Sequence, residues 1–200
     1  MNSLRQELLR LPGLPTMRML IPAGWRSLPL TDEHLSEFTR KFSEILMRAH
    51  RPDLDAELTA MLERWAKELR GQGGRFAILP LDRPEGSVLP MSLTVSIVSE
   101  LGGRSLDEWV AARIRQGGTD FLDDARTVLF WEGGASQGNG LNTRARTYLI
   151  PVPGTRRGQA VLLSGIELVA EDEPADGFRR EAASMLFDSV ALALDWLPAA

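Results

Sequence analysis

The residue types best suited to binding lie in the segment 143–160, which carries four arginines and no acidic side chain. Arg144, Arg146 and Tyr148 alternate along this segment, so a strand would direct all three side chains to one face. Arginine and tyrosine are residues that often anchor protein interfaces. We therefore expect these three residues to form a contact surface for a partner protein. The simpler alternative is a solvated strand face paired with the acidic run at 167–176.

A second set of residues would suit a small ligand. Trp25 and Trp131 lie at the start and the end of predicted strands, and His34 lies near the start of a predicted helix. Together they could line a cleft between the sheet and the helices inserted into it. The alternative is core or rim packing for the two tryptophans and a solvated helix start for His34.

Patterns typical of catalysis or metal binding are incomplete. His34 and Glu37 share a helical face, but a zinc site needs three or four converging ligands. Ser164 lacks the flanking glycines of a nucleophile elbow, and the glycine-rich segment 133–140 lacks both the Lys-Ser/Thr ending and the following helix of a phosphate loop. The sequence therefore predicts no catalytic residue, no cofactor and no metal, and we expect a protein that is not an enzyme.

The composition of the chain indicates which classes of partner it can bind and in which cellular compartment it is expected. The chain has 200 residues, a net charge of −4 and no cysteine, which excludes disulfides and thiolate chemistry and fits a reducing compartment. An acidic chain disfavours nucleic acid as a partner. Charged residues interrupt the leucines of segment 1–11, unlike a signal peptide, and no apolar run is long enough to span a membrane. These features predict a cytoplasmic protein with neither a nucleic-acid nor a membrane partner.

The elements that must position these residues follow from hydrophobic periodicity and turn residues. The period-two pattern predicts a β-hairpin over 143–169 around the Pro153-Gly154 turn, and a glycine-rich loop over 133–142. Further strands are predicted at 17–21, 26–30, 75–81, 91–98 and 126–131. Helical spacing predicts an N-terminal helix over 2–11, an inserted helical hairpin over 32–70, a helix opened by a Ser105 and Glu108 capping box, and a C-terminal helix over 177–197.

Strands joined by hairpins, with helices at the start, middle and end of the chain, predict the α+β class. We expect a mainly antiparallel sheet of about six or seven strands, flanked by helices on both faces as an α/β/α sandwich. No linker divides the chain, so residues 1–200 are predicted to form a single domain.

The order of these parts resembles a known fold group. The likeness rests on Pro22, Gly24 and Trp25, then on 148–154, then on 187–196 with its Trp-Leu ending. These segments are similar to the Mog/PsbP-like α/β/α sandwich, and in particular to LpqN-type relatives from high-GC bacteria. The resemblance implies a bacterial binding or accessory protein without an active site. LpqN-type proteins are exported lipoproteins, and this chain departs from them because it has neither a signal nor a cysteine.

Taken together, the sequence predicts a non-enzymatic cytoplasmic protein-binding or accessory module whose partner is unidentified. Two alternatives stay open at this point. One is an immunity or secretion-chaperone-like protein that masks a partner, and the other is a small-molecule binder or enzyme that uses the Trp25, His34 and Trp131 cleft. A homodimer formed through strand edges or the hairpin is a further option.

Overall fold

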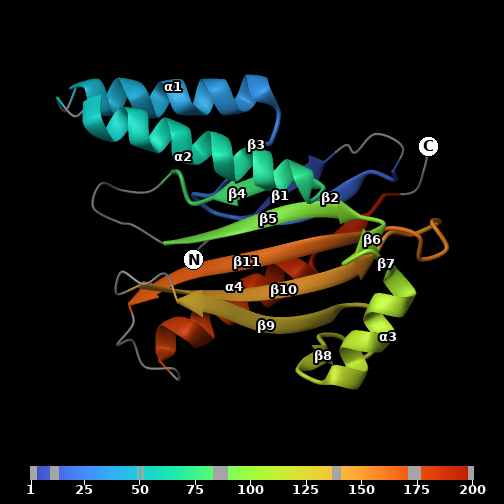
Figure 1. Cartoon of the computed structure of the whole chain (residues 1–200). Coiled ribbons are helices and arrows are strands. Elements are labelled where there is room, and N and C mark those ends of the chain that lie inside the picture. Colours follow the sequence, from blue (N-terminus) through green and yellow to red (C-terminus); the bar gives the residue numbers. More distant parts are fainter. Residues whose placement is uncertain are drawn as a thin grey trace.

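A seven-stranded sheet forms the centre of the computed structural model, which describes residues 4–9, 14–48, 50, 52–82, 90–136, 141–170 and 177–197. Its strand order is β3-β4-β5-β11-β10-β9-β8, and each neighbouring pair is antiparallel. Figure 1 shows these strands as one twisted layer. The strands are β3 (Arg26–Pro29), β4 (Gly74–Leu79), β5 (Met91–Val98), β8 (Thr119–Phe121), β9 (Leu129–Ser136), β10 (Leu141–Pro151) and β11 (Ala160–Ala170).

The hairpin of β10 and β11 lies near the middle of this sheet and is its longest pair. Its register runs from Leu141 opposite Ala170 to Pro151 opposite Ala160. The backbone N–H of Val152 donates to the carbonyl of Gln159 at 3.0 Å and closes the connection. The predicted hairpin is confirmed, and each strand extends beyond the predicted 143–169 boundaries.

One face of the main sheet is covered by α4 (Phe178–Leu192) and by a small second sheet of order β1-β2-β12. The small sheet consists of β1 (Leu4–Leu9), β2 (Met17–Pro22) and β12 (Asp195–Trp196). The largest hydrophobic cluster lies at this face, where Met17, Met19, Phe187 and Val190 meet side chains of the central strands.

The opposite face carries the other three described helices. The hairpin of α1 (Asp32–Arg48) and α2 (Pro52–Gly71) covers β3 and β4 through a cluster centred on Leu28, Leu30 and Ala77. Beyond the β6 (Glu100–Leu101) and β7 (Arg104–Ser105) hairpin, α3 (Leu106–Gln116) begins with the predicted Ser105 and Glu108 capping box. It packs on the strand ends around Leu129 and Leu149.

Strand parity explains the two faces. Successive residues of a strand point to opposite faces, and Tyr148 packs in the cluster beneath α4 whereas Leu149 packs against α3. Ile78 and Ala77 divide in the same way between the α4 cluster and the α1/α2 cluster. Figure 1 shows α4 behind the sheet, α1 and α2 above it, and α3 at its lower right. The predicted α+β class, with a mainly antiparallel sheet and helices on both faces, is confirmed.

The prediction of a helix over 2–11 is wrong, because residues 4–9 form β1. This strand pairs antiparallel with β2 along its whole length, from Leu4 opposite Pro22 to Leu9 opposite Met17. The leucine spacing reports only a local preference, and pairing with a neighbouring strand overrides such a preference.

Two other boundaries also differ from the predictions. The C-terminal helix ends at Leu192 rather than 197, because Asp195 and Trp196 pair with β2 as β12. Gly133 and Gly134 belong to β9 instead of a loop, and a side chain at Gly134 would collide with the carbonyl of Thr143 on β10. This glycine is therefore typical of close backbone approach inside a sheet. Residues 137–140 of the predicted loop lie outside the described residues.

The inserted helical hairpin is confirmed as α1 and α2, within two residues of the predicted boundaries. Across the described ranges, the helices all lack the combination of length and apolar character that crossing a bilayer requires.

Candidate functional site

Arg146 lies at the centre of a charged network between the sheet and α4. Its guanidinium donates from Nε to Asp188 Oδ1 at 2.7 Å and from Nη2 to Asp188 Oδ2 at 3.0 Å. Its Nη1 donates to Glu132 Oε1 at 2.5 Å. Only 14% of the Arg146 side chain is exposed. The two-point contact with Asp188 fixes the orientation of the guanidinium plane and attaches α4 to β10.

Tyr148 completes this network from the same strand. Its hydroxyl donates to Asp188 Oδ1 at 2.6 Å and accepts from Arg146 Nε at 3.1 Å. The side chain is completely buried. Burial raises the pKa of Tyr148 well above its ordinary value, and the hydrogen bond to Asp188 raises it further. Tyr148 is therefore a neutral hydrogen-bond donor at every physiological pH.

An aromatic ring and the aspartate together hold the arginine in its charged form. The guanidinium carbon of Arg146 lies 4.1 Å from the centre of the Phe130 ring, a cation–π contact. Burial lowers the pKa of Arg146, but the hydrogen bonds and charge of Asp188 outweigh this effect, and the pKa is raised overall.

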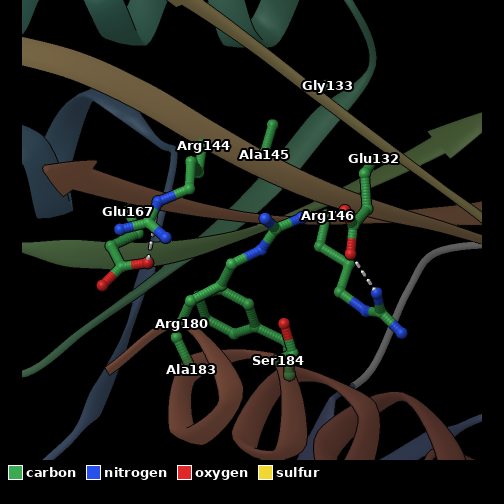
Figure 2. Close-up of a pocket in the computed structure, with 10 residues that line it drawn as sticks. Glu132, Gly133, Arg144, Ala145, Arg146, Glu167, Arg180, Ala183 and Ser184 are labelled. Carbon is green, nitrogen blue, oxygen red and sulfur yellow. Dashed lines mark hydrogen bonds and ion pairs between the residues drawn. The ribbon is translucent and has the colours of Figure 1, made fainter. Parts of the chain in front are cut away.

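A hollow of about 210 Å³ opens beside the network, between the first turns of α4 and the strands β9, β10 and β11. Arg180 on α4 donates from Nη2 to Glu132 Oε2 at 2.8 Å at one edge. Arg144 lies 3.8 Å from Glu167 at the other edge, measured from Nε to Oε2. Figure 2 shows Arg144 and Glu167 on one side of the hollow, Glu132 on the other, and Ala183 and Ser184 on the helix. We call the network and the hollow's charged edges, formed by Glu132, Arg144, Arg146, Tyr148, Glu167, Arg180 and Asp188, the arginine cluster.

A glycine lets α4 approach closely enough to build this site. Gly165 on β11 lies opposite Arg146 in the register. A Cβ atom there would lie 2.6 Å from the ring of Phe187, which is buried and also lines the hollow. The missing side chain therefore allows Phe187 to lie on the strand, and the next residue of the helix, Asp188, to reach Arg146.

The structure places Arg144, Arg146 and Tyr148 on one strand face, as their alternation predicts, but that face lies beneath α4. Tyr148 is buried and exposes no area to a partner. The prediction that Tyr148 forms part of the contact surface is therefore wrong. Arg146 is largely enclosed, and Arg144 keeps 24% of its side chain exposed. The cause is the cover supplied by α4, which strand parity does not reveal.

The other four members of the cluster are not among the predicted site residues. Glu132 comes from β9, Arg180 and Asp188 come from α4, and Glu167 on β11 is the first residue of the acidic run noted in the sequence. The available signal was Asp188 itself, because it is the single charged residue in the otherwise uncharged helical segment 182–194. A charge at such a position requires a partner.

The three residues of the predicted cleft do not lie together. Trp25 is buried in the main cluster beneath α4, whereas Trp131 packs against Trp109 of α3 with ring centres 5.1 Å apart. His34 is exposed at the start of α1, where its Nδ1 lies 2.7 Å from Thr31 Oγ1. Trp25 and Trp131 thus take the core and rim packing that was the alternative interpretation, and the predicted cleft is wrong.

The chemistry that the arginine cluster offers is recognition of charged and polar groups. Its guanidiniums present planar donors that match carboxylates. Within the described ranges, neither histidine lines the hollow, and no group of three or more His, Asp and Glu side chains is arranged to hold a metal ion.

Comparison with proteins of known structure identifies the fold of this chain. No protein-family model matches the chain, and no curated protein matches it. The structure is similar to the Saccharomyces cerevisiae Ran-binding protein Mog1p, with a TM-score of 0.50 and 12% identity, covering 97% of this chain and 96% of that one. A mutant of protein Mog1 gives a TM-score of 0.48 at 12% identity, covering 96% of each chain.

The fold is thus the Mog1p-like α+β fold, and the predicted Mog/PsbP-like architecture is confirmed. At this identity the likeness establishes the fold alone.

Proposed function

We propose that this protein is a non-enzymatic module that binds another protein, and that the hollow of the arginine cluster is the centre of its contact surface. The class of function is supported by the fold, which is that of a Ran-binding protein. The observation that carries the proposal is the arrangement at the hollow. A buried network fixes Arg146, while Arg180 and Glu132 remain 41% and 44% exposed at its edge.

This arrangement suits binding because its groups are held in place before a partner arrives. Arg146 and Asp188 anchor α4, and Arg180 on the same helix is held by Glu132. Rigid groups lose little conformational entropy on association. A partner that replaces the exposed Arg180–Glu132 pair with its own charged groups would therefore recognise a preformed surface.

The same geometry argues against catalysis at this site. Tyr148 is held neutral and donates to Asp188, so its hydroxyl is not available as a base. Ser184 lines the hollow, but no described histidine lines it to activate that hydroxyl. The arginine cluster is therefore better suited to recognition than to group transfer.

Affinity capture from the native cell lysate, quantified by mass spectrometry, tests the proposal. The blocking variant is Arg180→Glu with Ser184→Trp, which reverses a charge and fills the hollow without altering Arg146, Tyr148 or Asp188. The matched control is Arg64→Glu with Ala60→Trp, which makes the same charge reversal and introduces a tryptophan at the same spacing, on exposed positions of α2. We expect a stoichiometric protein captured by the wild type and the control and lost with the blocking variant.

If the blocking variant captures the same proteins as the wild type, the hollow is not the contact surface. If the wild type captures no protein reproducibly, the binding function itself is contradicted.

Two finer assignments belong to the same proposal. Kinship to LpqN-type proteins rests on the sequence segments around Trp25, 148–154 and 187–196. A cytoplasmic location rests on the cysteine-free composition. Fractionation of the native cells, with an antibody against the protein, tests the location directly.

A further inference from the structure

Two connections at one end of the main sheet hold arginines in a backbone conformation that arginine rarely adopts. Arg126, between β8 and β9, has a φ of 53°, and Arg156 and Arg157, between β10 and β11, have φ values of 52° and 64°. His50 is the other non-glycine residue with positive φ among the described residues. The left-handed region is unfavourable for residues that carry a Cβ atom, and glycine or asparagine usually occupies it.

The conformational cost is clearest in the turn at Arg156 and Arg157. The N–H of Gly158 donates to the carbonyl of Thr155 at 2.9 Å, so the two arginines are the central residues of a β-turn. Positive φ at both central positions is the mark of the type I′ turn, which favours Asn-Gly. Thr155 Oγ1 donates to the carbonyl of Val152 at 2.8 Å and fixes the connection. Arginines at these positions lower stability, which points to a role for their side chains.

Arg157 lies between two hollows with apolar walls. The first has a volume of about 580 Å³ and is also lined by Arg156, and the second has a volume of about 470 Å³ and is also lined by Arg126. Leu192 lines the first hollow and is 52% exposed, so it offers apolar surface at the rim of this hollow. The apolar walls comprise Val152, Leu194 and Trp196 in the first hollow and Val110, Phe121 and Leu149 in the second.

The charge at this end of the molecule favours an acidic ligand. The charged residues that line the two hollows are Arg126, Arg156, Arg157, Asp107 and Asp123. The carboxylate of Asp123 is engaged by its own loop, because it accepts from the N–H groups of Thr127 and Val128 at 2.8 Å. Within the described ranges, Arg156 and Arg157 form no ion pair.

We propose that this end of the sheet is a second docking surface, and that its occupant is an extended segment of a partner protein in which an acidic side chain lies between bulky apolar side chains. The carboxylate would pair with the guanidiniums of Arg156 and Arg157, which match it in charge and geometry. The apolar side chains would enter the hollows on either side of Arg157. This surface lies near the end of α4 at Leu192, whereas the hollow of the arginine cluster lies along the first turns of α4, and the hollows have no lining residue in common.

Selection from a random peptide library displayed on phage, against the immobilised full-length protein, tests this inference. We expect enriched peptides to contain Asp or Glu between Leu, Ile, Phe or Trp. The test variant is Arg156→Asn with Arg157→Gly, which gives the turn its preferred residues. We expect the enriched peptides to bind this variant about ten-fold more weakly in fluorescence polarisation, while its melting temperature equals or exceeds that of the wild type.

A second variant leaves the turn unchanged. Leu192→Glu places a negative charge at the rim of the first hollow, and we expect it to weaken peptide binding to a similar degree. The matched control is Arg48→Gln with Arg64→Gln, which removes two charges from exposed helical positions and should preserve the wild-type affinity.

The inference is overturned if no acidic and apolar peptides are enriched. It is also overturned if they bind the Asn-Gly variant as tightly as the wild type, or if binding is lost equally in the control. Sedimentation with phosphatidylglycerol vesicles serves as a further arm. If the wild type binds these vesicles, the Arg156→Asn and Arg157→Gly variant does not, and no peptide is enriched, the ligand is a lipid surface and the peptide proposal is wrong. Each of these results is independent of the arginine cluster, because its residues stay unaltered.

Discussion

At the scale of single residues, Arg146 connects more parts of the site than any other side chain. It contacts Glu132 on β9, Tyr148 on its own strand, Asp188 on α4 and the ring of Phe130. Its removal would leave the half-buried carboxylate of Asp188 without its cation, whereas Glu132 would keep its ion pair with Arg180. An enclosed charge that loses its partner is strongly unfavourable.

Arg146→Met should therefore lower the free energy of unfolding by about 3 kcal/mol. Asp188→Asn retains an acceptor for the Tyr148 hydroxyl and leaves the Arg146–Glu132 pair intact, so we expect a loss of only about 1 kcal/mol. Urea denaturation followed by tryptophan fluorescence measures both values. Equal losses for the two variants would contradict the central position of Arg146.

Tyr148 offers a pH test because it is the single tyrosine of the chain. Its pKa in the folded protein is raised above the ordinary value of 10.0, so the neutral hydroxyl is favoured by folding. The stabilisation is complete below about pH 10, the pKa in the unfolded chain, and declines as the pH rises above that value. Tyrosinate absorbance near 295 nm should therefore appear only together with unfolding. Ionisation of tyrosine near pH 10 in the folded protein would contradict the buried network.

The sequence predicts part of the arginine cluster and misses the rest for a physical reason. The alternation of Arg144, Arg146 and Tyr148 reports which side chains share a face, because strand parity is local. It does not report what covers that face. Asp188 is separated from Arg146 by 42 positions in the sequence, and only the packing of α4 brings the two together.

At the scale of elements, the contact between α4 and β11 depends on the absence of a side chain at Gly165. Gly165→Ala would place a methyl group against the buried ring of Phe187. We expect a loss of stability of about 1–3 kcal/mol, typical of overpacking in a core. Thermal denaturation provides the measurement.

Gly133→Ala is the control for this substitution, because a Cβ atom at Gly133 meets no atom within 4 Å. This variant should melt within a few degrees of the wild type. If both substitutions have the same small effect, the close packing of Phe187 on Gly165 is refuted.

Period-two patterns and capping residues predict the central elements well. The β10–β11 hairpin and the start of α3 at Ser105 both depend on local signals. The helical spacing of its leucines predicts a helix for the segment that forms β1, whereas the structure of this segment depends on pairing with β2. Edge pairing of this kind is non-local and leaves little trace in a short segment.

At the scale of the whole molecule, the α1/α2 hairpin is an insertion between two neighbouring strands. β3 and β4 pair directly, and the N–H of Leu30 donates to the carbonyl of Arg75 at 3.0 Å. The two ends of the insertion therefore lie close enough for a short turn to join them. Its apolar contacts form a cluster around Leu28, Leu30 and Ala77, separate from the clusters beneath α4 and α3.

Replacement of residues 32–71 by a short glycine-rich turn should preserve the main sheet and the arginine cluster. We expect a lower melting temperature, since Leu28 and Leu30 lose their cover, but an unchanged alkaline titration of Tyr148. Circular dichroism and absorbance near 295 nm check this outcome. A shortened chain that ionises Tyr148 near pH 10 would show that the insertion is required for the central fold.

The central claim is that the protein binds a partner at the hollow of the arginine cluster. The most direct test is hydrogen exchange, followed by mass spectrometry, of the protein alone and in complex with the partner captured from its own cells. We predict slower exchange in the complex for backbone amides of β9, the first half of β10 and the start of α4. Slowing confined to other elements, such as α1 and α2, or no change on addition of the partner, would contradict the claim.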